Sequence, residues 1–266
     1  MTTTSADAAE LRRIDGERMS NAVRSEVRHQ LNVAYGDHPR QVLDVYYPLP
    51  RTVSLPAPVL VFLHGGGFRT GTPARNAYQG RAALEHGALF VSMGYRLIPE
   101  ARFPDSVEDV EQGLLWLREH VAEHGGDPER IYVSGHSAGA MLAAWVVLRQ
   151  SAVDFVRGAV LISGFYDLSQ QPSDIVNPES PRFVPRLAEA IERVPPHTVI
   201  VFGERDLPGA EPAAHALHAA LQARGASVEL FVEPDADHYA ANRGFISTSG
   251  AVFQSVKRMM DLHDPR

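Results

Sequence analysis

The chain has 266 residues, with 25 Lys and Arg against 32 Asp and Glu, which gives a formal net charge of −7 with histidine neutral. It contains no Cys, which excludes structural disulfides, Cys-ligated zinc, iron–sulfur clusters and a Cys nucleophile. The acidic balance, without a long run of Lys or Arg, argues against nucleic acid or an anionic membrane as the main partner.

The first residues do not have the pattern of a secretory signal. Asp7 and Glu10 interrupt a polar start, and no uncharged apolar stretch of roughly 7–15 residues follows. No run approaches the roughly 20 apolar residues of a membrane span. We therefore expect a cytoplasmic protein without a membrane partner.

Apolar runs and amphipathic stretches alternate from about residue 40 onward, which predicts crossover units and a mostly parallel sheet covered by helices on both faces. The predicted strands span residues 40–48, 58–64, 89–97, 130–137, 158–164, 198–203 and 227–233. The predicted helices span residues 75–86, 105–123, 138–149, 212–224 and 244–262. This pattern predicts a single α/β domain over residues 1–266.

Two segments fall outside this rhythm. Residues 1–36, the N-terminal arm, are polar and Arg-rich, with a predicted helix over 7–20 and a strand near 26–35. Residues 165–197, the cap segment, hold six prolines and cannot form a core strand. We predict that this segment is a short cap containing one helix near 181–193.

The strongest chemical signal is Gly135-His136-Ser137-Ala138-Gly139, a G-x-S-x-G that a predicted strand precedes and a predicted helix follows. A Ser at such a strand-to-helix turn is exposed at the carboxyl end of the sheet, where ligands of α/β proteins bind. The sequence therefore predicts Ser137 as a nucleophile.

A second signal, His64-Gly65-Gly66-Gly67, follows another predicted buried strand. Consecutive glycines let backbone amides turn inward, where they can donate to a carbonyl oxygen that becomes an oxyanion. We predict that amides of Gly65, Gly66 or Gly67 act with that of Ala138 as an oxyanion hole. Which glycine amides donate stays open.

A Ser nucleophile needs a base, and the base needs an orienting acid, in the chain order Ser, acid, His. The histidines after Ser137 are His197, His215, His218, His238 and His263. Only His238 lies in a loop after a predicted strand, at the carboxyl edge. The others precede a strand, lie on a helix or lie at the C-terminal end.

The acid should follow the preceding strand, 198–203. Asp206 is the predicted acid and Glu204 the alternative. Asp235 and Asp237 share the loop of His238 and are interpreted as solvated loop carboxylates.

His120-Val121-Ala122-Glu123-His124 matches the H-x-x-E-H pattern of some zinc peptidases. We interpret it as a solvated helix end without a third ligand, and we interpret His215 and His218 as an exposed helix face. No metal and no cofactor is expected.

These motifs resemble those of the α/β-hydrolase superfamily, and within it those of the carboxylesterase branch related to hormone-sensitive lipase. Besides the two glycine motifs, the resemblance rests on the segments 95–100 (Y-R-L-I-P-E), 103–104 (F-P), 108–109 (E-D) and 125–128 (G-G-D-P). It implies the α/β-hydrolase fold and an esterase that acts through a Ser–Asp–His triad.

The chain departs from that branch at three places. His136 stands where the branch usually has Asp, Tyr239 and Ala240 follow the predicted base in place of Gly-Phe, and the cap is shorter. The compact size and the S-G-F-Y-D-L stretch at 163–168 also resemble kynurenine formamidases, which commonly carry an aromatic residue at the position of Gly67.

We therefore predict a serine hydrolase of short-chain carboxylic esters, and the alternatives are an aryl-formamidase or other amidase and a non-catalytic binding protein. The acyl pocket is expected to be small and apolar. Its predicted walls are Phe68, Phe165, Tyr166, Phe183 and Tyr239. The partner is a small ester or amide substrate, and the oligomeric state stays open, a homodimer included.

Overall fold

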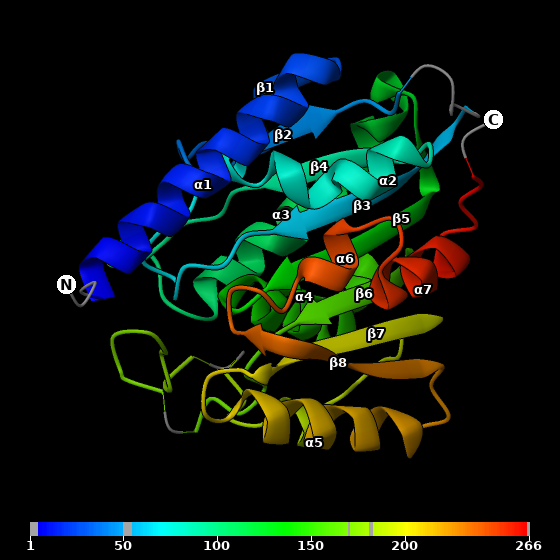
Figure 1. The fold of residues 1–266 in the computed structure, drawn as a ribbon. Coiled ribbons are helices and arrows are strands. Elements are labelled where there is room, and N and C mark those ends of the chain that lie inside the picture. Colours follow the sequence, from blue (N-terminus) through cyan, green and yellow to red (C-terminus); the bar gives the residue numbers. More distant parts are fainter. Residues whose placement is uncertain (1–4, 50–54, 170, 181–182, 265–266) are drawn as a thin grey trace.

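The computed structural model describes residues 5–49, 55–169, 171–180 and 183–264, with side chains from residue 10 onward. Its centre is an eight-stranded sheet in the order β1-β2-β4-β3-β5-β6-β7-β8 (Figure 1). The strands are β1 (His29–Ala34), β2 (Val42–Tyr46), β3 (Ala57–Leu63), β4 (Leu89–Met93), β5 (Gly126–His136), β6 (Val156–Ile162), β7 (His197–Arg205) and β8 (Val228–Asp237). β2 pairs antiparallel with β1 and β4, and all other pairings are parallel. The predicted α/β fold class is confirmed.

Helices cover both faces of the sheet. They are α1 (Ser5–Glu26), α2 (Arg81–Glu85), α3 (Asp105–His120), α4 (Ala138–Arg149), α5 (Ala210–Gln222), α6 (Arg243–Ile246) and α7 (Ala251–Met259). One core cluster joins α3, α4 and α5 to the sheet, and the other joins α1, α2, α6 and α7 to the opposite face. Within the described ranges, no helix has both the length and the apolar character that a membrane crossing requires.

β3 explains why its sequence is a continuous apolar run. Val59, Val61 and Leu63 face one core cluster, while Leu60 and Phe62 face the other, and all five are at most 1% exposed. A central parallel strand has no face toward solvent, so the side chains on both of its faces must be apolar. This buried strand ends at Leu63, so the glycines at 65–67 follow it after a single residue, His64.

Two predicted helices are broken. The helix predicted over 75–86 is two 3-10 turns, Pro73–Arg75 and Ala77–Gly80, followed by the short α2. A side chain at Gly80 would collide with the ring of Phe90, so the chain runs too close to the sheet for a regular helix. The helix predicted over 244–262 is split into α6 and α7, because the chain folds Gly250 against the backbone of Gly244.

The helix predicted near 181–193 is also wrong over its described residues, 183–193, where only the 3-10 turn Leu187–Glu189 forms. Residues 181 and 182 lie outside the described ranges. The amide of Leu168 donates to the Pro185 carbonyl and the amide of Leu187 donates to the Tyr166 carbonyl. The backbone thus bonds across the cap segment instead of closing helical turns. The predicted N-terminal helix and strand form as α1 and β1, and α1 is longer than predicted.

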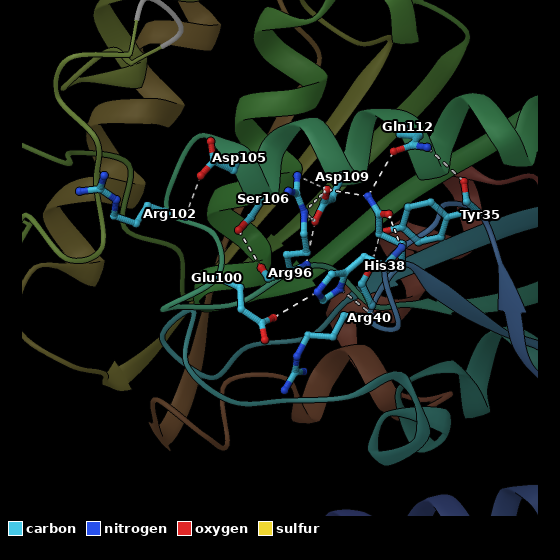
Figure 2. A network of polar contacts seen from close by, with 12 residues as sticks. Tyr35, His38, Arg40, Arg96, Glu100, Arg102, Asp105, Ser106, Asp109 and Gln112 are labelled. Carbon is cyan, nitrogen blue, oxygen red and sulfur yellow. Dashed lines mark hydrogen bonds and ion pairs between the residues drawn. The ribbon is translucent and has the colours of Figure 1, made fainter.

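A polar network joins α3 to the segment before β2 and to the segment after β4 (Figure 2). The Asp109 side chain is 1% exposed and accepts hydrogen bonds from the Arg96 guanidinium at 2.7 Å, the Arg96 amide at 2.7 Å and Gln41 Nε2 at 2.8 Å. Ser106 Oγ donates to the Arg96 carbonyl at 2.9 Å. These bonds hold the segment after β4, which packs beside the glycine loop after β3: the amide of Ile98 donates to the Phe68 carbonyl.

Asp109→Ala should lower the free energy of unfolding by about 3 kcal/mol, because it leaves the partly buried Arg96 without its carboxylate. Asp109→Asn, which keeps one acceptor oxygen, should cost less. Glu119→Ala, at an exposed position of the same helix, is the control and should change stability by about 0.5 kcal/mol or less. Urea unfolding followed by circular dichroism measures all three, and equal stability of Asp109→Ala and Glu119→Ala would contradict the expectation.

Candidate active site

Ser137 lies between the end of β5 and the start of α4, with φ of +54° and ψ of −120°. This conformation is strained for a residue with a Cβ. Close packing of the backbone explains why both ends of the motif are glycine. A Cβ at Gly139 would collide with the Leu63 carbonyl, and a Cβ at Gly135 would collide with the Gly139 carbonyl. The motif therefore lets α4 start directly against β3 and β5, and the turn presents the hydroxyl at the carboxyl edge of the sheet.

Ser137, His238 and Asp206 form one hydrogen-bonded series. The Ser137 hydroxyl lies 2.9 Å from His238 Nε2, and His238 Nδ1 donates to Asp206 Oδ1 at 2.6 Å. Asp206 follows β7 and His238 follows β8, so neighbouring parallel strands deliver both groups to the same edge. The side chains of His238 and Asp206 are 5% and 3% exposed, so bulk water does not compete for this bond.

Asp206 is held as an anion by its surroundings. Burial by itself would raise the pKa of this carboxyl, but the hydrogen bond from His238 and three others outweigh it and hold the pKa far below its usual range. The three others come from Ser163 Oγ at 2.5 Å, the Gly203 amide at 3.0 Å and the Leu207 amide at 2.7 Å. Sequence reasoning missed Ser163, although its place directly after β6, beside the strand that ends at the acid, was a usable signal.

The other carboxylates lie elsewhere. Glu204 accepts a hydrogen bond from the Asp235 amide at 2.8 Å, and Asp237 accepts from the amides of Tyr239 and Ala240 in its own loop. Among the described residues, only Asp206 is hydrogen-bonded to the His238 ring through a carboxylate. The geometry thus brings together Ser137, His238 and Asp206, the three residues predicted as nucleophile, base and acid.

His136 is a second residue of the site that sequence reasoning noted only as a departure from a family pattern. Its Nε2 donates to the backbone carbonyl of His238 at 2.7 Å, and the two rings lie 4.9 Å apart. Burial, with the nearby His238, lowers the pKa of His136 to about 4. A neutral imidazole at this position ties the loop of His238 to the turn that carries Ser137.

The glycine loop after β3 lies against the same turn. A Cβ built on Gly65 would lie 3.3 Å from the Ser137 Cβ, and Gly66 and Gly67 have φ of +120° and +59°. His64 anchors the loop: its Nδ1 donates to the Gly65 carbonyl at 2.8 Å, and its ring stacks on Tyr95 with centroids 4.4 Å apart. Burial lowers the pKa of His64 to about 4, so it adds no charge.

A cleft of about 620 Å³ opens over Ser137 and His238. One wall comes from the N-terminal arm, through Arg12, Gly16 and Met19 of α1, and Figure 1 shows this helix lying obliquely across one side of the sheet. No residue of the cap segment lines the cleft in the part of the chain that the structure describes. Among the described residues, α1 and not the cap segment forms the roof of the cleft.

Of the predicted pocket walls, only Tyr239 lines the cleft. Phe68 and Tyr166 are each 3% exposed and belong to the hydrophobic core. Phe68 has φ of +61° and packs its ring edge-on against Phe103, away from the nucleophile. Phe165 lies 6.0 Å from the His238 ring without lining the cleft.

The cleft is also more polar than predicted. Phe62, Met19 and Leu207 contribute apolar surface, but a row of amide and phenol groups lies beside them. This row consists of Asn76, Tyr78, Gln79 and Asn242. Asn242 Nδ2 donates to Gln79 Oε1 at 3.0 Å, and Gln79 Nε2 lies 3.0 Å from the Tyr78 hydroxyl. These groups can accept or donate hydrogen bonds to a bound molecule.

The two histidines of the H-x-x-E-H segment contact aromatic side chains. The ring of His120 stacks on Trp116 with centroids 4.4 Å apart, and His124 Nδ1 lies 2.9 Å from the Tyr47 hydroxyl. His215 packs edge-on against Phe202. Within the described ranges, no group of three or more His, Asp or Glu side chains is arranged to hold a metal ion.

The chain matches a family model, related protein sequences and solved structures. A family model described as alpha/beta hydrolase fold matches residues 60–179. An isoprenylcysteine alpha-carbonyl methylesterase of Arabidopsis thaliana is 37% identical over 120 residues, which is 45% of this chain and 28% of that protein. A kynurenine formamidase of Salmo salar is 27% identical over 247 residues, 86% of this chain and 81% of that protein. The chain thus spans less than a third of the length of the plant methylesterases that it matches.

Solved structures match over almost the whole chain. Esterase B of Lactobacillus rhamnosis has a TM-score of 0.75 at 18% identity, covering 96% of this chain and 92% of that one. An esterase of Pyrobaculum calidifontis has a TM-score of 0.71 at 24% identity, covering 95% and 92%. At these identities the likeness concerns the fold. The resemblance read from the motifs is confirmed at this level, and the chain is an α/β-hydrolase-fold protein.

Proposed function

We propose that this chain is a serine hydrolase of carboxylic esters, with Ser137 as nucleophile, His238 as general base and Asp206 as the orienting acid. The observation that carries the proposal is the continuous series Ser137 Oγ–His238 Nε2–His238 Nδ1–Asp206, with distances of 2.9 and 2.6 Å. A serine hydroxyl is a weak nucleophile, and a neutral imidazole at hydrogen-bond distance is what activates it.

In the proposed reaction, Ser137 Oγ attacks the ester carbonyl while His238 Nε2 takes its proton. The tetrahedral intermediate collapses when His238 returns that proton to the leaving alcohol, and an acyl-enzyme remains. Water then attacks the acyl group with His238 again acting as base, which releases the acid and restores the serine. Asp206 stays ionised throughout, since its hydrogen bonds hold its pKa low, and it stabilises the imidazolium that forms at each step.

The oxyanion of each tetrahedral intermediate needs donors next to Ser137. We assign them to the amide of Ala138 at the start of α4 and to amides of the Gly65–Gly67 loop. The first amides of a helix have no partner within the helix, and the Gly65 position lies directly beside the nucleophile. Each such donor contributes about 3–4 kcal/mol in comparable sites.

Names of related proteins support ester cleavage. The plant relatives are methylesterases, and the two solved structures are esterases. In this chain α1 closes one side of the cleft, which favours small esters over long-chain lipids. The reaction needs no cofactor.

A second candidate is the cleavage of an aryl formamide, and one observation favours it. The kynurenine formamidase match extends over 86% of this chain, whereas the methylesterase match covers 45%. Formamide cleavage uses the same nucleophile, base and oxyanion donors, so the two differ in the bound substrate only. A higher kcat/KM for N-formylkynurenine than for p-nitrophenyl acetate and butyrate would select this second candidate. A binding protein without catalysis is the third reading, and the intact series of hydrogen bonds counts against it.

Ser137→Ala should abolish hydrolysis of p-nitrophenyl acetate and butyrate, with a loss of kcat of about 10⁴-fold or more, because the acyl-enzyme cannot form. The wild type should also be labelled by a fluorophosphonate at Ser137, and the variant should not. Mass spectrometry of the labelled peptide locates the adduct. Full activity in Ser137→Ala, or a label on another serine, would refute the mechanism.

Asp206→Asn should lower kcat by about 10⁴-fold, because an amide cannot fix the imidazole tautomer or stabilise the imidazolium. Glu204→Gln, the matched change two residues earlier, should stay within a few-fold of the wild type. Steady-state kinetics on p-nitrophenyl butyrate compares them. A large loss in Glu204→Gln with little loss in Asp206→Asn would exchange the two roles.

His136→Phe should lower kcat by about tenfold at unchanged KM, because the loop of His238 loses one hydrogen bond worth roughly 1–1.5 kcal/mol. His136→Gln, which keeps an N–H donor, should recover most of the activity. The two variants are compared in a kinetic assay at pH 7.5. Equal kcat values in both would show that the donor does not position the base.

His136 also contributes a pH dependence to stability. Its pKa is about 4 in the fold and near 6.5 in the unfolded chain, so unfolding takes up a proton between these values and stability falls as the pH is lowered from about 6.5 to 4. Between pH 7.5 and 4.5, His136→Gln should therefore lose about 2 kcal/mol less stability than the wild type, as measured by urea unfolding.

A further inference from the structure

The cleft carries a charge opposite to that of the whole protein. Three guanidinium groups and one carboxylate line it, whereas the chain has a formal net charge of −7. These groups are Arg12, Arg13 and Asp15 of α1 and Arg75 of the 3-10 turn that follows the glycine loop. A cleft in which lining charges of one sign predominate attracts small molecules of the opposite sign.

Two of the three arginines already have carboxylate partners. Arg13 donates to Glu10, with a closest distance of 2.5 Å, and to Glu17 at 2.9 Å. Arg75 Nε donates to the same Glu17 at 3.1 Å. These exposed pairs neutralise one another, so neither arginine offers an uncompensated charge to a bound molecule.

Arg12 is different. Its guanidinium carbon lies 3.8 Å from the centroid of the Tyr239 ring, and no side chain of the described residues forms an ion pair with it. Tyr239 follows the base directly, and its ring centroid lies 5.3 Å from that of His238. Stacking on an aromatic face occupies the plane of a guanidinium and leaves the N–H donors at its edge free for a carboxylate. Tyr239 therefore holds, close to the reacting centre, a cation that has no ion pair among the described side chains.

We propose that Arg12 is the binding site for a carboxylate of the substrate, so that the preferred substrates are half-esters whose free carboxylate lies a few bonds from the scissile carbonyl. This inference rests on the proposed ester hydrolysis, since it names the class of ester. The amide and phenol groups that line the same cleft suit the polar chain of such a molecule better than a purely aliphatic acyl group. A two-pronged Arg–carboxylate bond supplies both affinity and orientation.

The competing explanation is mechanical. The contact between Arg12 and Tyr239 could serve only to fasten α1 over the cleft. Loss of that contact would then affect every ester alike, whatever its charge. The two explanations differ in one measurable quantity, the ratio of kcat/KM between a charged ester and its neutral counterpart.

The experiment uses monoethyl succinate, glutarate and adipate, each beside the matching neutral ester in which the free carboxyl is a primary amide. Hydrolysis is followed in a pH-stat for the wild type, Arg12→Gln and Arg12→Lys. The wild type should prefer one of the half-esters over its amide by tenfold or more. Arg12→Gln should lose this preference, mainly through KM, and Arg12→Lys should keep part of it. Arg224→Gln, at an exposed position just after α5 and outside the cleft, is the control and should keep the full preference.

The outcomes separate the possibilities. No preference for any half-ester in the wild type, or the same fractional loss on charged and neutral esters in Arg12→Gln, would overturn the carboxylate site. The preference should also shrink between 20 mM and 500 mM NaCl, since the attraction is partly exposed to solvent. A site that is insensitive to salt and to Arg12 would point to another group.

Failure of the proposed hydrolysis would appear separately, as no turnover of any ester and no fluorophosphonate label. The carboxylate site is then tested by binding alone. Calorimetric titration of monoethyl glutarate into Ser137→Ala and into the double variant Ser137→Ala/Arg12→Gln compares their Kd values without turnover. A tenfold weaker Kd in the double variant supports the site, and equal affinity, or no binding to either protein, overturns it.

Discussion

The close approach of α4 to β3 and β5 is the constraint on which the rest of this structure depends. It is possible only because Gly135 and Gly139 lack side chains at the two points where backbone meets backbone. The turn between them forces Ser137 into a conformation with positive φ, and it also brings the end of β3 against the nucleophile. The glycine loop after β3 therefore needs no separate element to place it beside the serine. One packing requirement supplies both the nucleophile and the backbone amides that we assign to the oxyanion.

The parallel sheet then places the remaining groups by topology. β6, β7 and β8 are neighbours, and the residues that follow them are Ser163, Asp206 and His238. Their hydrogen bonds run across the strand ends, so the carboxylate is fixed by four donors before any substrate arrives. Two further histidines stay neutral through burial, and one of them, His136, fastens the loop of His238 to the nucleophile turn. The buried anion Asp206 thus lies in a site where burial keeps His64 and His136 neutral.

The roof of the cleft comes from the N-terminal helix, and this changes the chemistry that the site can select. A roof made from the proline-rich segment 165–197 would have added aromatic and aliphatic surface. α1 instead brings arginines, one of which, Arg12, stacks on Tyr239 and has no ion pair among the described residues. Together with Arg13 and Arg75, it makes most of the charged groups that line the cleft cationic, although the whole protein is acidic, and Asn76, Gln79 and Asn242 add polar groups. In our proposal, substrate selection therefore depends on α1, whereas catalysis depends on groups at the carboxyl ends of the strands.

The sequence by itself determined the α/β fold class and the turn at Ser137, and it predicted the chain order of the proposed acid and base. Those features are local: a buried strand, two glycines and a loop after a strand each leave a short pattern around Ser137, Asp206 and His238. Only the tertiary structure decided which residues line the cleft. Phe68 follows the glycine loop directly in sequence, yet its positive φ directs it into the core, while Arg12 reaches the cleft from more than 100 residues before the nucleophile. Walls of a cleft are set by packing between distant segments, and no pattern along the chain records that packing.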